Sequence, residues 1–375
     1  MELGYSVVKG ICLLMGCSLR TSNWIIKKEE AKKNGLKIGV TPKQYKEMLR
    51  MNLKLSNPKT IMTWGSPGIG KTEIIYQLAQ EENVEVVSVI LTLYDPTEIK
   101  GLMVYNPNED KVKLVPMIDI PMKKFIFFID EINTAPQAVR DASLRIIHEK
   151  KIADVALPED TMIVLAGNRN EDKINPTRFT APFINRCCHV MLEPSFEDWK
   201  EWGYPTGKVH PSIYAYLERF PEHFVTPPAI DRPFCTPRSW KNVSDVLEFN
   251  YPQFVYGYVG EDVGVNFFNF IKHCDGIDKD IKNILKGNFI YPPASEIERS
   301  WMLATILPVS AKDDQDIERL MEYSAKAPEH WNTFAICMVK NMVLNFSNNV
   351  IIKLSKGKYA QEFNRRFKEL KIYEE

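Results

Sequence analysis

Residues 65–72 have the residue types and spacing of a phosphate-binding loop. They read Gly-Ser-Pro-Gly-Ile-Gly-Lys-Thr and fill every fixed position of the pattern G-x-x-x-x-G-K-[ST]. Glycines let backbone N–H groups close around phosphate oxygens without a Cβ in the way. Lys71 can reach the β- and γ-phosphates, and the Thr72 hydroxyl can ligate Mg²⁺. We therefore expect a nucleotide to bind here through Gly65, Ser66, Pro67, Gly68, Ile69, Gly70, Lys71 and Thr72.

A second group of chemically competent residues follows at 125–131, which reads Phe-Ile-Phe-Phe-Ile-Asp-Glu. A strand buried on both faces is continuously apolar, and its carboxyl end opens onto the ligand crevice of an α/β sheet. Asp130 can hold the Mg²⁺ shell there, and Glu131 can polarise an attacking water. Hydrolysis requires a positioned water and metal-neutralised phosphates. After a phosphate loop, this pattern predicts an ATPase that uses Mg²⁺, in preference to a strand with an ordinary acidic turn.

A third apolar run, at 162–166, leads to Asn168. An amide at this point can hydrogen-bond the γ-phosphate or the attacking water. Taken alone the signal is weak, because asparagine in such a loop is usually a turn or cap residue.

Alternating strands and helices must position these groups. Residues 60–64 are expected to form a buried strand that enters the loop, and 72–79 a helix that leaves it. Further strands are expected at 86–91, 125–130, 162–166 and 188–192. From about 206 to 345, aromatic residues and leucines recur at helical spacing between proline-rich breaks. This order predicts an α/β fold with a parallel sheet flanked by helices, followed by a mostly helical region.

The expected domains are an N-terminal extension at 1–40, an ATPase core at 41–205, a helical region at 206–345 and a basic amphipathic helical tail at 346–375. The extension should contain an exposed helix at 27–33. In the tail, Tyr359, Phe363, Phe367 and Leu370 share one helical face. We expect this face to dock on the body in preference to a membrane or nucleic acid.

Composition counts against several classes of protein. The 375 residues contain 48 Lys+Arg and 48 Asp+Glu, so no global field favours nucleic acid or a membrane surface. Seven cysteines without a C-x-x-C pair suggest free thiols in a reducing, cytoplasmic setting. We expect Cys187, Cys188 and His189 to be buried in a strand, since the spaced second half of a zinc site is absent. No apolar run reaches the roughly 18 residues of a membrane span.

Taken together, the motifs resemble those of MoxR-like AAA+ ATPases in the dynein-related AAA_5 group, most of all its single-module bacterial and phage members. The resemblance rests on the phosphate loop and on 130–136 (DEINTAP), 166–169 (AGNR) with Asp172, 185–186 (NR) and 236–240 (TPRSW). It extends from about Thr41 to Cys274, and more loosely to Leu344. It implies an AAA+ P-loop NTPase core with a helical lid domain.

The resemblance also implies roles for residues whose type and position alone do not indicate a function. Asn168 takes the sensor 1 position. Arg186 resembles the arginine finger that reaches the γ-phosphate in a neighbouring subunit, and Arg238 resembles sensor 2 of the lid. A guanidinium suits both tasks because it is always charged and can bridge phosphate oxygens. A surface ion pair is the alternative for each arginine. The implied assembly is a homo-oligomeric ring, hexameric in this family.

Two hairpins are expected on the same grounds. One lies within 103–122, which carries an alternating apolar pattern at 111–116, and the other at 152–158. In the family such hairpins line the ring pore and touch the substrate, whereas the alternative is a surface hairpin without partners.

The leading interpretation is therefore a ring-forming ATPase that remodels or activates a protein partner, in this family often a protein with a von Willebrand A-type domain. One alternative is an AAA+ motor subunit that acts on nucleic acid, as in restriction or phage systems, against which the zero net charge counts. A second alternative is a P-loop phosphotransferase, against which the pair Asp130 and Glu131 counts. The last alternative function is a structural switch that binds ATP and hydrolyses it negligibly.

Overall fold

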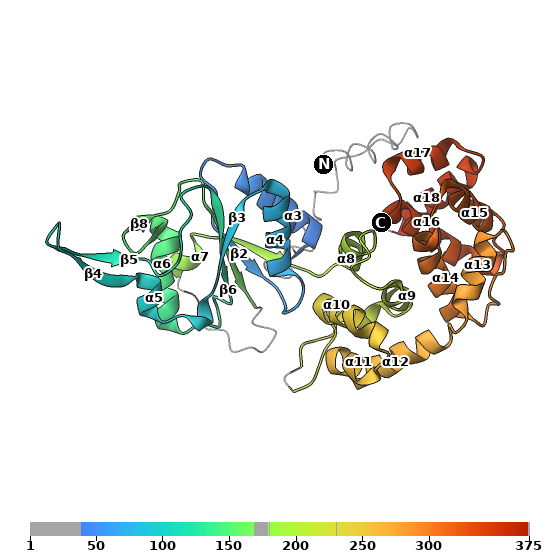
Figure 1. Cartoon of the computed structure of the whole chain (residues 1–375), viewed down its shortest axis with the longest axis horizontal. Coiled ribbons are helices and arrows are strands. Elements are labelled where there is room, and N and C mark those ends of the chain that lie inside the picture. The colour runs from blue at the N-terminus through green and yellow to red at the C-terminus, as the bar shows by residue number, and fades with distance from the viewer. Residues whose placement is uncertain (1–38, 169–178, 180, 230, 374–375) are drawn as a thin grey trace. The chain divides into compact units, whose positions relative to one another are not determined.

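The computed structural model describes residues 39–373 apart from 169–178, 180 and 230, and the chain divides into two compact units. The sheet unit comprises the described residues up to Asp198 together with Thr236–Arg238. The helical unit comprises Trp199–Cys235 and the chain from Ser239 onward. Figure 1 colours the sheet unit mainly blue to green and the helical unit mainly yellow to red. The expected helix at 27–33 lies outside the described residues.

A six-stranded, fully parallel sheet forms the centre of the sheet unit. Its spatial order is β1-β10-β2-β9-β6-β3. The strands are β1 (Gly39–Val40), β2 (Ile61–Trp64), β3 (Glu85–Ile90), β6 (Phe125–Asp130), β9 (Met162–Gly167) and β10 (Cys188–Leu192). The α/β fold and the five expected strands are confirmed, with bounds that differ by at most one residue.

Each face of the sheet is covered by helices, which is why the central strands are continuously apolar. In β6, Phe125, Phe127 and Ile129 pack in one core cluster and Ile126 and Phe128 in another, because successive side chains of a strand point to opposite faces. The first cluster includes residues of α5 (Pro96–Lys100) and α6 (Gln137–Glu149). The second includes residues of α3 (Pro42–Leu53) and α4 (Lys71–Glu82). This burial fixes the strand end that carries Asp130.

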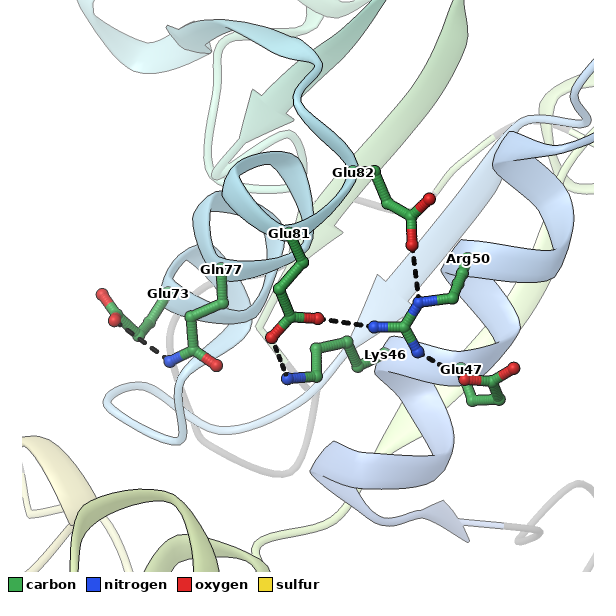
Figure 2. Close-up of polar contacts among 7 residues, drawn as sticks. All are labelled: Lys46, Glu47, Arg50, Glu73, Gln77, Glu81 and Glu82. Carbon is green, nitrogen blue, oxygen red and sulfur yellow. Dashed lines mark hydrogen bonds and ion pairs between the residues drawn. The ribbon is translucent and has the colours of Figure 1, made fainter. Parts of the chain in front are cut away.

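The helix that follows the phosphate loop, α4, is tied to α3 by a network of charges (Figure 2). Arg50 of α3 pairs with Glu81 and Glu82 of α4 and with Glu47 of its own helix, and Lys46 pairs with Glu81. Single exposed ion pairs contribute little, but a guanidinium shared by several carboxylates restrains both helices. The start of α3 is also stabilised, by a capping box at Thr41.

Both expected hairpins are present. β4 (Leu102–Asn106) pairs antiparallel with β5 (Lys111–Val115), and β7 (Lys151–Ile152) pairs antiparallel with β8 (Val155–Ala156). The β4–β5 hairpin extends away from the sheet (Figure 1) and exposes apolar side chains, with Met103 80% accessible. A short helix, α7 (Ala181–Ile184), precedes β10.

Every element assigned in the helical unit is a helix, within the residues that the structure describes there. The helices are α8 (Phe196–Gly203), α9 (Pro211–Arg219), α10 (Pro237–Val246), α11 (Pro252–Val259), α12 (Glu261–Lys272), α13 (Ile277–Leu285), α14 (Ile297–Ser310), α15 (Asp314–Ala325), α16 (Asn332–Asn345), α17 (Asn348–Lys356) and α18 (Ala360–Tyr373), of which α8 and α10 begin in the sheet unit. No helix in the described ranges is long and apolar enough to cross a membrane.

The tail docks on this unit as expected. Phe363 of α18 is 1% exposed and belongs to the core cluster that α14, α15 and α16 share. Arg366, one turn further on, is 2% exposed and donates hydrogen bonds to backbone oxygens of Ser324 and Asn332. At this position of the tail, a basic side chain is therefore part of the packing of α18 against the rest of the helical unit.

Candidate active site

The phosphate loop connects β2 to α4, and its conformation explains its glycines. Gly68 and Gly70 have φ angles of 75° and 97°, a region that side chains with a Cβ avoid. Open space surrounds the position where a Cβ of Gly70 would stand. Ile69 is instead buried in the core, so its contribution to the loop is made by its backbone. The loop is thus anchored by the Ile69 side chain and leaves open space beside Gly70.

Lys71, the first residue of α4, is held inside the loop. Its ammonium donates to the carbonyl oxygens of Gly65 (2.6 Å) and Ser66 (3.0 Å) and to the side-chain oxygen of Asn168 (3.1 Å). The side chain is largely buried, at 9% exposure for the residue. Lys71 and Asn168 are 97 residues apart in the chain, and the structure brings them into direct contact.

Thr72 and Asp130 are also in contact, since the Thr72 hydroxyl donates to Oδ2 of Asp130 over 2.9 Å. A hydroxyl and a carboxylate are hard oxygen ligands of the kind that Mg²⁺ prefers, and Mg²⁺ commonly takes few protein ligands and completes its shell with water and phosphate oxygens. Thr72 and Asp130 therefore fit the metal that the sequence predicts. No cluster of three or more His, Cys, Asp or Glu with metal-binding geometry occurs among the described residues.

Glu131 follows the end of β6 in a left-handed conformation, with a φ angle of 55°. This region costs a non-glycine residue free energy and is often found at functional sites. The backbone N–H of Glu131 donates to Oδ1 of Asp130 (2.8 Å), and the Thr92 hydroxyl donates to Oε2 of Glu131 (3.3 Å). Thr92 is a contact that the sequence did not single out. Asp130 thus holds the backbone of Glu131 and Thr92 contacts its carboxylate, while the Glu131 side chain stays exposed to water.

Asn133 is a second residue that the sequence did not single out. Its side-chain amide nitrogen donates to the backbone oxygen of Asn168 (2.8 Å), and its oxygen accepts from the Asn168 backbone N–H (3.0 Å). Asn133 is fully buried. The sequence signal for it was its place within 130–136 (DEINTAP), one of the motifs on which the family resemblance rests.

Arg238 lies beside the phosphate loop through its backbone. Its N–H donates to the carbonyl oxygen of Gly68 (3.1 Å), and a Cβ on Gly68 would stand 2.7 Å from the Thr236 hydroxyl. Thr236–Arg238 belong to the sheet unit, although α10 continues into the helical unit. The Arg238 side chain is exposed, and it makes no ion pair with any residue that the structure describes.

Arg186 stands apart from this group. It is exposed two residues after α7, and its guanidinium contacts Nε2 of His148 from α6 over 2.8 Å. Arg186 is always charged and can only donate, so His148 must accept with a neutral ring.

The three residues that follow Arg186 in the chain are less buried than the sequence analysis expected. Cys188 is exposed at the start of β10, because a strand's first residue lies at the rim of the sheet, and Cys187 and His189 are partly covered.

Both ring nitrogens of His189 are engaged in contacts within the protein. Trp64, the last residue of β2, donates its ring N–H to Nδ1 of His189 (2.9 Å), and the other ring nitrogen of His189 contacts the carbonyl oxygen of Ile184 (2.9 Å). Burial raises the pKa of the Cys187 thiol to about 11, so this thiol stays protonated at neutral pH.

The site geometry agrees with comparisons to known proteins. A family model described as AAA domain (dynein-related subfamily) matches residues 60–186, about a third of the chain. This segment contains the phosphate loop, both acidic residues, Asn168 and Arg186. Residues 60–186 are thus similar to an AAA domain of the dynein-related subfamily, and the protein is an ATPase.

More distant likenesses add little. The "putative ATPase" of Cytophaga hutchinsonii is 15% identical over 87% of this chain and 89% of its own, with a TM-score of 0.33. NtrX of Brucella abortus is 15% identical over 86% of this chain and 67% of its own, with a TM-score of 0.30. At these TM-scores neither structure bears on function. A comparison with curated proteins finds no match.

Proposed function

We propose that this protein is a MoxR-like AAA+ ATPase that hydrolyses Mg²⁺-ATP at the interfaces of a homo-oligomeric ring and remodels or activates a protein partner. In this proposal Lys71 and Thr72 bind the phosphates and the metal, Asp130 completes the metal shell and Glu131 polarises the attacking water. Asn168 and Arg238 contact the γ-phosphate, and the arginine that completes the site comes from the next subunit as Arg186.

The observation that carries the proposal is the position of Arg186. Its side chain is exposed and rests on His148, whereas Lys71 and Asn168 bond to each other without it. An exposed guanidinium can leave a hydrogen bond to a neutral imidazole for a charged phosphate, because hydrogen bonds between two ionised groups are the stronger ones. An arginine supplied by a neighbour makes hydrolysis depend on assembly.

A mixing experiment tests this dependence. Arg186→Ala and Lys71→Ala should each be inactive alone, since removal of an arginine finger costs about 10³-fold or more in rate in related systems. In a mixed ring, some interfaces pair an intact Lys71 site with an intact Arg186, so turnover should return from two inactive parents. If Arg186 acted within its own subunit, every chain in the mixture would still lack one essential group.

Arg145→Ala is the matched control, because Arg145 is an exposed arginine of α6 whose ion pair is with Glu149, one turn away. This variant should retain turnover. Mixtures that co-assemble, as shown by native mass spectrometry, yet stay inactive would count against the proposal. Turnover per chain that is independent of protein concentration would count against it as well.

The protein partner can be captured with a variant that binds ATP and does not hydrolyse it. Glu131→Gln should hold the ring in its ATP-bound form together with the partner, so a pull-down from the source cells should enrich one protein over the Lys71→Ala control. A von Willebrand A-type domain in that protein would support the MoxR-like assignment. Salt-sensitive capture of nucleic acid in its place would favour the motor function.

The β4–β5 hairpin is the segment we assign to contact with the partner. Its side chains Met103, Tyr105 and Val112 are all more than half exposed, and single exposed apolar residues are common but a run of them on a protruding hairpin is not. Substituting these three residues by serine should reduce partner capture by the Glu131→Gln variant and leave ATP binding unchanged.

A further inference from the structure

We infer that Asn133 is a positioning residue for ATP hydrolysis, which acts by holding the backbone of Asn168 in place. The inference rests on the proposed role of Asn168 at the γ-phosphate. It concerns a contact between two loops, since Asn133 follows β6 and Asn168 follows β9.

The need for such a residue follows from the way the two strands end. β6 and β9 pair in parallel register up to Ile129 and Leu165. Beyond this point β6 turns away at Glu131, whose φ angle of 55° is incompatible with a continued strand. Without β6 as a neighbour, the backbone groups of the partly buried Asn168 need another partner, because N–H and C=O groups shielded from water are costly when unpaired.

The side chain of Asn133 supplies that partner. A primary amide offers one acceptor and two donors, as a neighbouring peptide group offers one of each. Its oxygen accepts from the Asn168 N–H and its nitrogen donates to the Asn168 carbonyl, so both bonds of one backbone residue are made by one side chain. Aspartate lacks the donor, and alanine lacks both groups.

The residues just before Asn168 are held by backbone hydrogen bonds, which leave this segment little freedom to move. Ile132 N–H donates to the Ala166 carbonyl (3.1 Å), and Gly65 N–H donates to the Gly167 carbonyl (3.2 Å). A Cβ on Gly167 would stand 2.8 Å from the Asn133 oxygen, so the glycine permits the close approach of this amide. The segment that presents Asn168 is thereby joined to the acidic loop and to the phosphate loop at once.

The consequence for catalysis is geometric. The Asn168 side chain contacts the Lys71 ammonium at 3.1 Å, and a shift of the Asn168 backbone would move its amide relative to the phosphates. A misplacement of about 1 Å can cost on the order of 100-fold in rate. Asn133 bonds to the Asn168 backbone, whereas the bonds from Lys71 to the phosphate loop are made without it. Its loss should therefore lower kcat and leave ATP affinity nearly unchanged.

A double-mutant cycle on the full-length protein tests the inference. Asn133→Ala should lower kcat by about 10-fold to 100-fold, with the dissociation constant for ATP, measured by calorimetry, within about threefold of the wild type. Asn133→Asp, which keeps the volume and loses the donor, should behave alike. In the Asn168→Ala background, Asn133→Ala should add little, because residues that act through one contact are not additive.

A control and a second readout separate positioning from general stability. Ser143→Ala removes another fully buried polar side chain of the sheet unit, whose hydroxyl donates to Arg140 O (2.7 Å), and it should preserve kcat. By hydrogen exchange, the Asn168 amide should be protected in the wild type and should exchange faster in Asn133→Ala, with the β9 amides unchanged.

The outcomes are distinct. A wild type whose turnover is absent or insensitive to Lys71→Ala would refute the proposed function, and the inference with it. With an active wild type, the inference alone is overturned by an unchanged kcat in Asn133→Ala, by additive effects with Asn168→Ala, or by an equal loss of ATP binding. If both Asn133 variants fail to fold, an unprotected Asn168 amide in the wild type overturns it.

Discussion

Lys71 directs its ammonium at three oxygens of its own protein, two from the phosphate loop and one from Asn168. An ammonium has three hydrogens, so phosphate oxygens must take over at least one of these contacts when ATP binds. The exchange is favourable because a phosphate oxygen is charged and the displaced acceptors are neutral. The loop is thus held ready by the same residue that recognises the ligand.

This arrangement predicts the result of removing the ammonium. Lys71→Ala should abolish detectable ATP binding in calorimetry, because the central cation of the site is removed. Folding should persist, since the acceptors of this ammonium lie in the loops that follow β2 and β9. Lys113→Ala, a substitution of an exposed lysine on β5, should bind ATP as the wild type does. Unchanged affinity in Lys71→Ala would refute the phosphate-loop assignment.

A second prediction concerns Glu131. Glu131→Gln should bind Mg²⁺-ATP with unchanged affinity and hydrolyse it about 10²-fold to 10⁴-fold more slowly, because an amide cannot accept the proton that a carboxylate can. Single-turnover phosphate release measures the rate. Glu149→Gln, at an exposed position of α6, should hydrolyse normally. If Glu131→Gln retained full turnover, another group would have to serve as the base.

At the scale of elements, the helix α18 shows how a charged side chain can be part of a core. Arg366 donates to Glu362 on its own helix and to backbone oxygens on α15 and α16. Arg365, its neighbour in sequence, is exposed and pairs with Glu362 at the surface. The two side chains have the same chemistry and differ in burial, so substitutions of Arg366 and Arg365 can be compared as a variant and its control.

The expected stability effects differ accordingly. Arg366→Ala should lower the free energy of unfolding by about 3 kcal/mol, because it leaves buried backbone acceptors without their donor and removes a nearly fully buried charged partner of Glu362. Arg365→Ala should cost less than about 1 kcal/mol, as surface ion pairs contribute little. Urea denaturation followed by tryptophan fluorescence measures both. Equal effects would show that α18 does not depend on the Arg366 contacts.

At the scale of the whole molecule, the thiol beside Arg186, the proposed arginine finger, offers a probe of assembly. Cys188 is exposed two residues after Arg186, and Cys187 is partly buried with its pKa raised to about 11. Thiolates are the reactive form, so at pH 7.5 a maleimide should modify Cys188 and leave Cys187 unmodified. Raising the pH should increase labelling of Cys187, because its thiolate fraction grows as the pH approaches its pKa.

Ring formation through Arg186 should protect Cys188. Its labelling rate, followed by mass spectrometry of the peptide that contains Cys188, should fall as protein concentration passes the assembly midpoint. Arg186→Ala kept below that midpoint provides the unprotected reference. Equal rates in the monomer and in a demonstrated oligomer would place the subunit interface elsewhere.

Much of the sheet unit was determined locally, and the sequence alone was sufficient to predict it. The phosphate loop needs glycines at given steps, and β6 must be apolar at each residue because both of its faces are buried. These requirements act on neighbouring residues, so they leave a readable pattern. The strands, the hairpins within 103–122 and 152–158, and the docking of the tail through Phe363 all follow such patterns and are confirmed.

Only the tertiary structure decided which distant side chains meet. Asn133 and Asn168 are 35 residues apart, Thr92 and Glu131 are 39 apart, and Arg186 reaches His148 over 38. Each pairing depends on the strand order β2-β9-β6-β3 and on where each strand ends. Local periodicity carries no information about that order, since a buried strand has the same apolar pattern in any position of the sheet. The partners of the chemically obvious residues therefore emerged from the fold, because hydrogen bonds form between groups that are adjacent in space and not in sequence.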